Sequence, residues 1–447
     1  MNLFLRIRRT LFLALVAASA LVSLARAQGV QQDAAANNTI RISLQDALER
    51  ARKNSTVFNA AVTEAAVSKE DKNQARDALL PSVAYSNSAI YTQGNGPGSQ
   101  IRFIANNAVH EYVSQGNVHE VLDVATFRQY RAAAAAASAA KARLEIASRG
   151  LVVTVVQNYY GTLAAQKKLE AATKAADEGE KFLQLAQSLE KGGEVAHADV
   201  IKAELQANDR RRQLQEARLA VLNTRLDLSV LIFPNFADNF ELVDDLHSPV
   251  TLPALPEVEQ RAARDNPEVR EALETVKQAG NNVSASRAGY LPSLSLDYFY
   301  GIDAAHFATR TDGNSNLGSS AIATLNIPVW NWGSTQSRVK QAELRKAQAQ
   351  RELSFAQRKL LREIRSLYSE AETASNELTN LERSAQLAAE SLRLAMLRYK
   401  NGETNILEVV DAQNTFAQAS AGYHDGAVRY RVALANLQTL TGVLRAP

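Results

Sequence analysis

The sequence contains no cysteine among its 447 residues. This absence excludes disulfide bonds, thiolate ligands for a metal and a lipid-anchored N-terminal cysteine. Beyond residue 27, no apolar run approaches the roughly 18 residues that a membrane-spanning helix needs. We therefore expect an exported chain that is either soluble outside the cytoplasm or held in an outer membrane by strands.

Motifs for catalysis or cofactor binding are also missing. The six histidines form neither an HxxxH nor an HExxH pair, and no GxSxG, P-loop or GxGxxG pattern occurs. His110-Glu111 and His119-Glu120 are expected in loop or solvent positions rather than in a metal site. The stretch Gly94 to Gly98 lacks the Lys-Ser/Thr of a phosphate loop and suits a turn between strands. We expect no enzyme activity, no cofactor and no metal.

The first 27 residues have the features of a signal peptide. Three arginines between residues 6 and 9 precede the apolar stretch Leu11 to Leu24, and Ala25-Arg26-Ala27 fits a signal-peptidase site. Arg8-Arg9 also suits a twin-arginine signal, but we favour the general secretory route because nothing downstream suggests a cofactor loaded before export. Residues 28–39 are expected to form a flexible polar arm.

Removal of this segment changes the charge balance. The segment holds four arginines and no acidic residue, so 50 basic against 47 acidic residues become 46 against 47. The alkaline pI of about 8.9 therefore reflects the signal and gives no reason to expect nucleic acid as a partner.

The dominant pattern of the chain is a heptad repeat from Leu353 to Tyr399. Thirteen of its fourteen core positions are apolar or tyrosine, and no proline or glycine interrupts the run. A 3.5-residue apolar period predicts a long helix with a left-handed coiled-coil seam. At about 1.5 Å per residue such a helix reaches roughly 70 Å. The core positions are Leu353, Gln357, Leu360, Ile364, Leu367, Ala371, Ala374, Leu378, Leu381, Ala385, Ala388, Leu392, Ala395 and Tyr399.

The chain is internally duplicated. Leu80-Pro81-Ser82 recurs 211 residues later as Leu291-Pro292-Ser293, and Gly193-Glu194 recurs 209 residues later as Gly402-Glu403. We predict two helix–hairpin–helix–helix repeats, at 40–233 and 257–443, with hairpins at about 82–122 and 293–330. A proline-containing linker at 234–256 joins the repeats and a tail covers 444–447. Each repeat is expected to begin with one continuous helix, to about Leu79 in the first and from Glu257 to Gly289 in the second.

The last helix of each repeat shows a seam in which large and small residues alternate. In the second repeat the alternating positions are Val409, Phe416, Tyr423, Tyr430 and Leu437 with Ala412, Ala419, Gly426, Ala433 and Leu440. In the first repeat they are Val200, Ala207, Leu214, Val221 and Leu228 with Ala203, Arg210, Ala217, Thr224 and Leu231.

The hairpins show the period-2 alternation of membrane strands. Leu294, Leu296, Tyr298 and Tyr300 share one face, and alternation continues over 319–330 for about the ten residues that a tilted strand needs to cross a bilayer. A small soluble sheet is the simpler alternative. Each hairpin is expected to lack a partner sheet within the chain, and four strands cannot close a barrel. Membrane insertion would therefore require several chains to pool their strands.

Two further motifs lie at the end of the last strand and at the end of the heptad helix. One motif, Ile327-Pro328-Val329-Trp330-Asn331-Trp332-Gly333, leaves the last strand. The other runs from Tyr399 to Ala412 and reads Tyr-Lys-Asn-Gly-Glu-Thr-Asn-Ile-Leu-Glu-Val-Val-Asp-Ala. Together with the duplication, they make the chain resemble the TolC-like outer-membrane efflux protein family over residues 40–443. The resemblance implies a mainly α fold with membrane β-hairpins. Three chains would share a 12-stranded β-barrel in the outer membrane, and their long helices would form an α-barrel tunnel in the periplasm.

The resemblance also implies a periplasmic constriction ringed by acidic side chains. Glu408 and Asp411 match the ring positions, Asp199 matches a polar link between helices, and Tyr399 matches a residue that helps to hold the closed state. Three-fold symmetry would make each acid a ring of charge that attracts cations. The simpler alternative is that both acids are solvated helix-face charges.

One position departs from the family pattern. Where the family has a basic residue two positions after the turn glycine, this chain has Thr404, so the family's salt-bridged lock is absent or replaced. The resemblance further implies helix tips that contact an adaptor at Gly192, Gly193, Gly402 and Thr404. Tyr298, Tyr300, Trp330 and Trp332 are expected in an interfacial aromatic girdle.

The function that we expect is that of a passive exit duct. It would carry substrates from an inner-membrane pump and a periplasmic membrane-fusion adaptor, across the outer-membrane lipid, to the exterior. The alternatives are the outer-membrane component of type I protein secretion, and a soluble periplasmic coiled-coil adaptor or structural protein. The absence of a lipoyl-like β domain counts against the adaptor.

Overall fold

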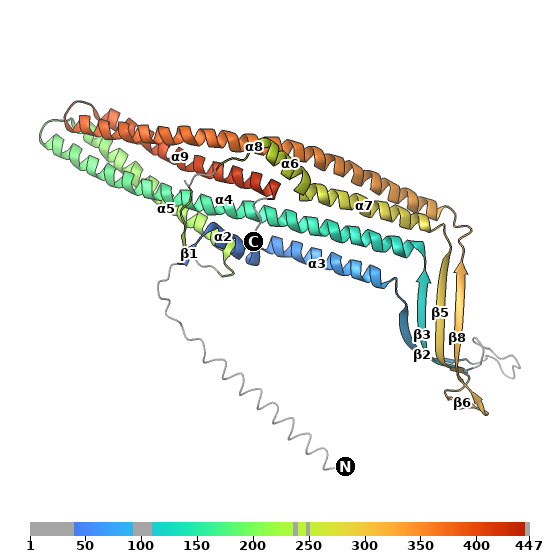
Figure 1. Cartoon of the computed structure of the whole chain (residues 1–447). Helices are drawn as coiled ribbons and strands as arrows, with labels where there is room; N and C mark the ends of the chain where they lie inside the picture. Colours follow the sequence, from blue (N-terminus) through green and yellow to red (C-terminus); the bar gives the residue numbers. More distant parts are fainter. Residues whose placement is uncertain (1–39, 93–109, 236–239, 247–250, 443–447) are drawn as a thin grey trace, which may run out of the picture. The chain divides into compact units, whose positions relative to one another are not determined.

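The computed structural model describes residues 40–92, 110–235, 240–246 and 251–442 (Figure 1). The predicted signal peptide, the polar arm, the glycine-rich turn and the C-terminal tail lie outside these residues. The chain divides into a small unit, Met1–Arg41 with Asn239–Glu241, and a large unit, Ile42–Asp238 with Leu242–Pro447.

The small unit contributes most of a two-stranded sheet. It pairs β1 (Ile40–Ile42) with β4 (Phe240–Leu242), and Arg41 Nε lies 3.7 Å from Glu241 Oε2. The sequence did not predict either strand. Three-residue strands carry too short a pattern to separate them from a linker.

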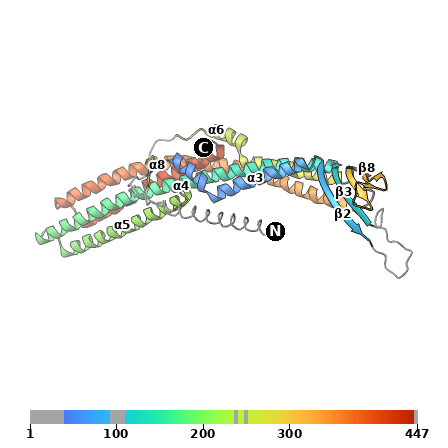
Figure 2. The ribbon, with the colours of Figure 1, turned by 90° about the horizontal axis from the view of Figure 1, so that it is seen from below.

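The large unit contains eight helices among the described residues. The helix α4 packs against α3, α7, α5 and α9, and α8 packs against α7 and α9 (Figures 1 and 2). Within the described ranges, none of these helices is both long enough and apolar enough to cross a bilayer. They are α2 (Leu44–Asn54), α3 (Thr56–Asp77), α4 (Val124–Lys191), α5 (His197–Ile232), α6 (Leu255–Asp265), α7 (Pro267–Ala288), α8 (Ser334–Lys400) and α9 (Ile406–Thr441).

The first helix of each repeat is broken, which corrects the prediction of continuous helices. Ser55 separates α2 from α3, and Asn266 separates α6 from α7; both residues are extended and cap the following helix with their side chains. Pro267 has no backbone N–H to continue α6 and is well suited to the first position of α7. The two breaks lie 211 residues apart, like the Leu-Pro-Ser motifs.

The heptad pattern is confirmed as a packed seam on α8. All thirteen apolar or tyrosine core positions are buried or half-buried, whereas the fourteenth, Gln357, is exposed. Positions beside the seam, such as Arg351 and Glu352, face solvent. This is the pattern that a coiled-coil seam requires.

The two hairpins form one sheet, in the order β2-β3-β5-β8. The strands are β2 (Ser82–Tyr91), β3 (His110–Leu122), β5 (Ser293–Ala304) and β8 (Leu317–Asn326), all antiparallel to their neighbours. The prediction that each hairpin lacks a partner within the chain was therefore wrong. Pairing between β3 and β5 involves residues far apart in sequence, which a local pattern cannot reveal. The expected polar loop after β5 contains a short hairpin of β6 (Arg310–Thr311) and β7 (Asn314–Ser315).

The strand register separates an apolar from a polar face. Cross-strand partners in an antiparallel sheet lie on the same face. One row contains Val83, Val118, Tyr298 and Ala321, and the next row, on the opposite face, contains Ala84, Asn117, Phe299 and Ser320. The mostly apolar face also holds Tyr85, Leu294, Leu296, Tyr300, Ala323 and Leu325, with Asn87 and Glu120 among the exceptions. The mostly polar face also holds Ser82, Ser86, His119, Ser295, Asp297 and Thr324, with Val121 and Ile322 among the exceptions.

The last strand is shorter than the sequence suggested. β8 ends at Asn326, because Pro328 has no backbone N–H with which to extend the ladder. Trp330 and Trp332 therefore lie in the connection to α8, where their rings pack edge to face with centroids 5.8 Å apart. Both side chains are exposed.

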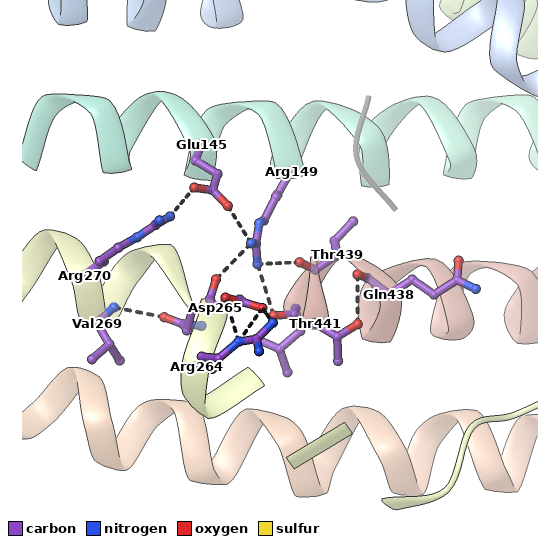
Figure 3. A network of polar contacts seen from close by, with 11 residues as sticks. Glu145, Arg149, Arg264, Asp265, Val269, Arg270, Gln438, Thr439 and Thr441 are labelled. Atoms are coloured by element: carbon purple, nitrogen blue, oxygen red, sulfur yellow. Dashed lines mark hydrogen bonds and ion pairs between the residues drawn. The ribbon is translucent and has the colours of Figure 1, made fainter. Parts of the chain in front are cut away.

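A buried arginine fixes the region where α6, α7 and α9 meet α4 (Figure 3). Arg149 Nη1 donates to the Thr439 carbonyl at 2.7 Å, and Nη2 donates to the Asp265 carbonyl at 2.9 Å and to Glu145 Oε1 at 2.6 Å. Glu145 also pairs with Arg270. The C-terminal end of a helix carries partial negative charge, so a cation between these two helix ends is favourable.

Candidate functional site: the helix tips

The two long helices end in matching turns. Residues 192–196 join α4 to α5, and residues 401–405 join α8 to α9. Gly193 has φ of +75° and Gly402 has φ of +74°. In each turn, the residue after this glycine donates to a carbonyl five residues earlier: Glu194 to Leu189 and Glu403 to Arg398, both at 2.9 Å. This is a Schellman cap, which glycine favours because it accepts positive φ without strain.

An apolar cluster holds the tips together. It includes Phe182 from α4, Val200 from α5, Tyr399 from α8 and Val409 from α9. The rings of Phe182 and Tyr399 lie with centroids 5.0 Å apart and a tilt of 56°. All four helices therefore meet in one core just below the turns.

Tyr399 lies in this core with a buried hydroxyl. Only 4% of the residue is exposed, and no described residue forms a hydrogen bond with its hydroxyl oxygen. Burial raises the pKa of Tyr399, and the charge of Asp199 raises it further. Asp199 lies in the first turn of α5, 3.8 Å from Lys202 Nζ. The tertiary structure thus brings Tyr399 and Asp199 into the same tip.

Glu408 is held by three neighbours. Its backbone N–H donates to Asn405 Oδ1 at 3.2 Å, which caps α9. Its carboxylate accepts hydrogen bonds from the Thr404 hydroxyl and from Arg398 in the last turn of α8. An acidic residue in the first turn of a helix also interacts favourably with the helix dipole. Glu408 is therefore a neutralised charge that joins α9 to α8.

Asp411 differs from Glu408. It lies three residues further along α9, so both carboxylates lie on one side of the helix. Asp411 is exposed, and it has no ion pair with any residue that the structure describes. Of the two acids on this face of α9, Asp411 is therefore the one whose charge is not paired.

The first repeat has the opposite charge arrangement at its tip. Glu190 on α4 accepts from His197 on α5, with Nδ1 2.6 Å from Oε1. There the long helix supplies the acid, whereas in the second repeat the long helix supplies the base, Arg398.

Comparisons with known proteins identify this architecture. The family model described as outer membrane efflux protein matches residues 47–232 and again residues 258–443. The chain belongs to this family.

Individual relatives and structures agree with the family. The chain is 24% identical to the alkaline protease secretion protein AprF of Pseudomonas aeruginosa over 417 residues, covering 90% of this chain and 85% of the relative. It is 23% identical to the outer membrane protein TolC of Escherichia coli over 424 residues, covering 90% and 82%. The crystal structure of the Campylobacter jejuni CmeC outer membrane channel matches with a TM-score of 0.79 at 19% identity, over 89% and 85% of the two chains.

As an outer membrane efflux protein, this chain is a channel component of efflux or type I secretion in the outer membrane, with its helical tunnel in the periplasm. It is a passive channel and not an enzyme. The soluble periplasmic adaptor is therefore no longer an alternative.

The sequence identified the acids but missed the basic partner of Glu408. Glu408, Asp411, Asp199 and Tyr399 all lie at the tips, as do Gly192, Gly193, Gly402 and Thr404. Arg398 was not singled out. A basic residue ten positions before an acidic one, on the other side of the turn that joins two helices, is the pattern that would have revealed Arg398.

Proposed function

We propose that three copies of this outer membrane efflux protein form the exit duct of a tripartite efflux pump. The supporting observation is an open four-stranded sheet with β2 and β8 at its edges and exposed apolar side chains on one face. Unpaired strand edges are unfavourable in lipid, and four strands cannot close on themselves. Three such sheets make a 12-stranded barrel without edges.

In this proposal the apolar face contacts the outer-membrane lipid. Tyr298 and Tyr300 lie on that face, and Trp330 and Trp332 follow the strand end with exposed rings, which suits an interfacial girdle. The helix tips lie at the other ends of α4 and α8 (Figure 1). They would contact a periplasmic membrane-fusion adaptor and its inner-membrane pump through Gly192, Gly193, Gly402 and Thr404.

We further propose that the tips form the closed end of the duct. The Arg398–Glu408 ion pair replaces the family's salt-bridged lock and holds α9 against α8. Three copies of Asp411 would form a ring of unpaired charge, which attracts cations at a narrow mouth. Opening would move α9 away from α8 and break the ion pair.

Single-channel recording of the purified protein in planar bilayers tests this assignment. We expect Asp411→Asn to reduce the cation-to-anion permeability ratio at least about fivefold, because each unit charge about 4 Å away in water changes the energy of a cation by about 1 kcal/mol and three such charges are removed. Arg398→Gln should raise that ratio and the open probability, since it frees Glu408. Arg393→Gln, which removes an equal charge paired with Glu390 on α8, is the matched control.

The assignment fails if Asp411→Asn leaves ion selectivity unchanged, or if Arg393→Gln has the same effect as Arg398→Gln. The double variant Glu70→Gln with Asp71→Asn removes acidic charge from α3, which is not part of the tips, and should leave ion selectivity unchanged.

Type I protein secretion is the second candidate function. It is favoured by the match to the protease secretion protein AprF over 90% of this chain. Expression in a host that lacks its own channel separates the two. Restored resistance to small toxic compounds without polypeptide export supports the efflux duct, whereas restored export of a polypeptide alone supports the secretion channel.

A further inference from the structure

A pocket lies where α4, α5 and α9 meet, several turns from the tips. Its volume is about 180 Å³. A cavity of about 150 Å³ is large enough for benzene. Most of the wall is apolar, and it is formed by Ala171, Ala172, Ala175, Phe416, Ala417 and Ala421.

Arg210 from α5 also lines this pocket and is almost completely buried, with 3% of its surface exposed. Its guanidinium donates to Gln213 Oε1 at 2.8 Å and to Asn414 Oδ1 at 2.9 Å. The amide oxygen of Gln206 accepts from Arg210 Nε at 3.2 Å and from Nη2 at 3.0 Å. All three acceptors are neutral amides, and within the described ranges no carboxylate lies within ion-pair distance of the guanidinium. Burial lowers the pKa of Arg210, and the charges of Asp209 and Glu178 only partly oppose this effect.

The fold itself does not require a cation at this position. In the second repeat the residue 209 positions later is Ala419, as expected for a seam of large and small side chains. A buried charge without a counter-charge is costly, so its presence in one repeat only indicates a separate role.

The other charged groups around the pocket differ from Arg210, because Lys168 is paired and Glu178 is exposed to solvent. Lys168 Nζ is paired with both carboxylate oxygens of Asp425, at 2.6 and 2.8 Å. Glu178 is exposed, and His424 lies at the α9 side. Among these groups, Arg210 is the buried cation that lacks an anion.

Gln413 provides a second polar group in the pocket wall. It is 6% exposed, and its Oε1 has no hydrogen-bond partner among the described residues. A half-turn of the side-chain amide exchanges Oε1 and Nε2, so Gln413 can offer a donor as well as an acceptor. An anion bound to Arg210 could accept from this donor.

We propose that this pocket binds a small carboxylate with an apolar body of benzoate size. The carboxylate pairs with the Arg210 guanidinium, and the apolar body packs against Phe416 and the alanines. A guanidinium and a carboxylate form charge-assisted hydrogen bonds that neutral amides cannot replace. This inference does not depend on the proposed gate at Asp411.

The test uses the purified full-length protein in an uncharged detergent, with 4-fluorobenzoate followed by ¹⁹F NMR. We expect saturable binding that unlabelled benzoate displaces, and no comparable binding of 4-fluorobenzamide. Arg210→Gln should weaken binding at least about tenfold, because a hydrogen bond to a charged group contributes roughly 1.5–3 kcal/mol.

Two further variants make the result specific. Arg211→Gln removes the neighbouring exposed arginine, which pairs with Glu180, and should leave binding unchanged. Ala417→Leu keeps Arg210 but fills the pocket and should abolish binding. The proposal is wrong if the wild-type protein shows no saturable binding. A carboxylate of a neighbouring copy that is already paired with Arg210 would give that result. The proposal is also wrong if the amide binds equally well or if Arg210→Gln binds like the wild type.

Discussion

Arg149 shows how one residue can bind the ends of two helices. Its residue surface is 9% exposed, and it donates to carbonyls that end α9 and α6 (Figure 3). Burial alone would raise the pKa of Glu145, but the hydrogen bond and charge of Arg149, with Arg270, keep that pKa below its usual value. The cluster therefore depends on an ionised Glu145.

This dependence predicts a loss of stability in acid. Because the folded-state pKa of Glu145 is lowered, its contribution is fully present above the unfolded pKa, about 4.3 for Glu, and is lost as the pH falls through the folded value. We expect Glu145→Gln to melt at a lower temperature at pH 7 and to show a weaker pH dependence than the wild type below about pH 5. Circular dichroism melts test this, with Glu216→Gln on α5 as the control. Parallel acid dependence in wild type and Glu145→Gln would contradict it.

Single residues also explain why prediction from the sequence was incomplete at the helix tips. The motif around Gly402 identified Glu408 and Asp411, because a family pattern preserves positions in the sequence. It did not identify Arg398, since an ion pair between α8 and α9 depends on how the two helices leave the turn. Thr404 is part of that arrangement and donates to the same carboxylate.

At the scale of elements, the turn between α4 and α5 offers a matched comparison of two adjacent glycines. Gly193 has φ of +75°, whereas Gly192 is right-handed with φ of −77°. A side chain in left-handed conformation costs about 1–2 kcal/mol.

We therefore expect Gly193→Ala to loosen the tip and Gly192→Ala to have a smaller effect. A cost of about 1 kcal/mol corresponds to roughly fivefold faster exchange of the amides of Gly193 and Glu194. Hydrogen exchange read by mass spectrometry over the tip peptide measures this. Equal protection in both variants would show that the conformation of Gly193 is not the determinant.

The strand faces give a second prediction for an element. Ala321 lies on the apolar face opposite Tyr298, and its neighbour Ser320 lies on the polar face opposite Phe299. An arginine facing lipid near the bilayer midplane costs about 2–4 kcal/mol. Ala321→Arg should therefore reduce the protein recovered from the outer-membrane fraction, while Ser320→Arg should not. Helicity should stay the same in both, and equal recovery would contradict the proposed orientation of β8.

At the scale of the whole molecule, the open sheet means that the number of chains per particle decides whether a shared barrel can form. A sheet with edges at β2 and β8 needs neighbours, and three copies supply 12 strands. We expect light scattering of the detergent-extracted protein, corrected for bound detergent, to give three chains per particle. One or two chains would refute the shared barrel and, with it, the ring of Asp411 charges.

The sequence by itself determined the long helices, the duplication, the turns at the tips and the alternation of the strands. These features follow from local periods and from glycine and proline, which act within a few residues. It even located both hairpins by their Leu-Pro-Ser starts. The breaks at Ser55 and Asn266 were missed, because a single extended cap barely changes a helical pattern.

Only the tertiary structure decided which segments meet. Four features join residues from different elements: the pairing of β3 with β5, the two helix ends bound by Arg149, the Arg398–Glu408 ion pair and the burial of Arg210 beside Phe416. Their free energy depends on distance and on exclusion of water, and neither quantity is encoded in the period of any one segment. For this reason, the sequence indicated the class of protein, while the contacts at the proposed gate and in the proposed binding pocket required the structure.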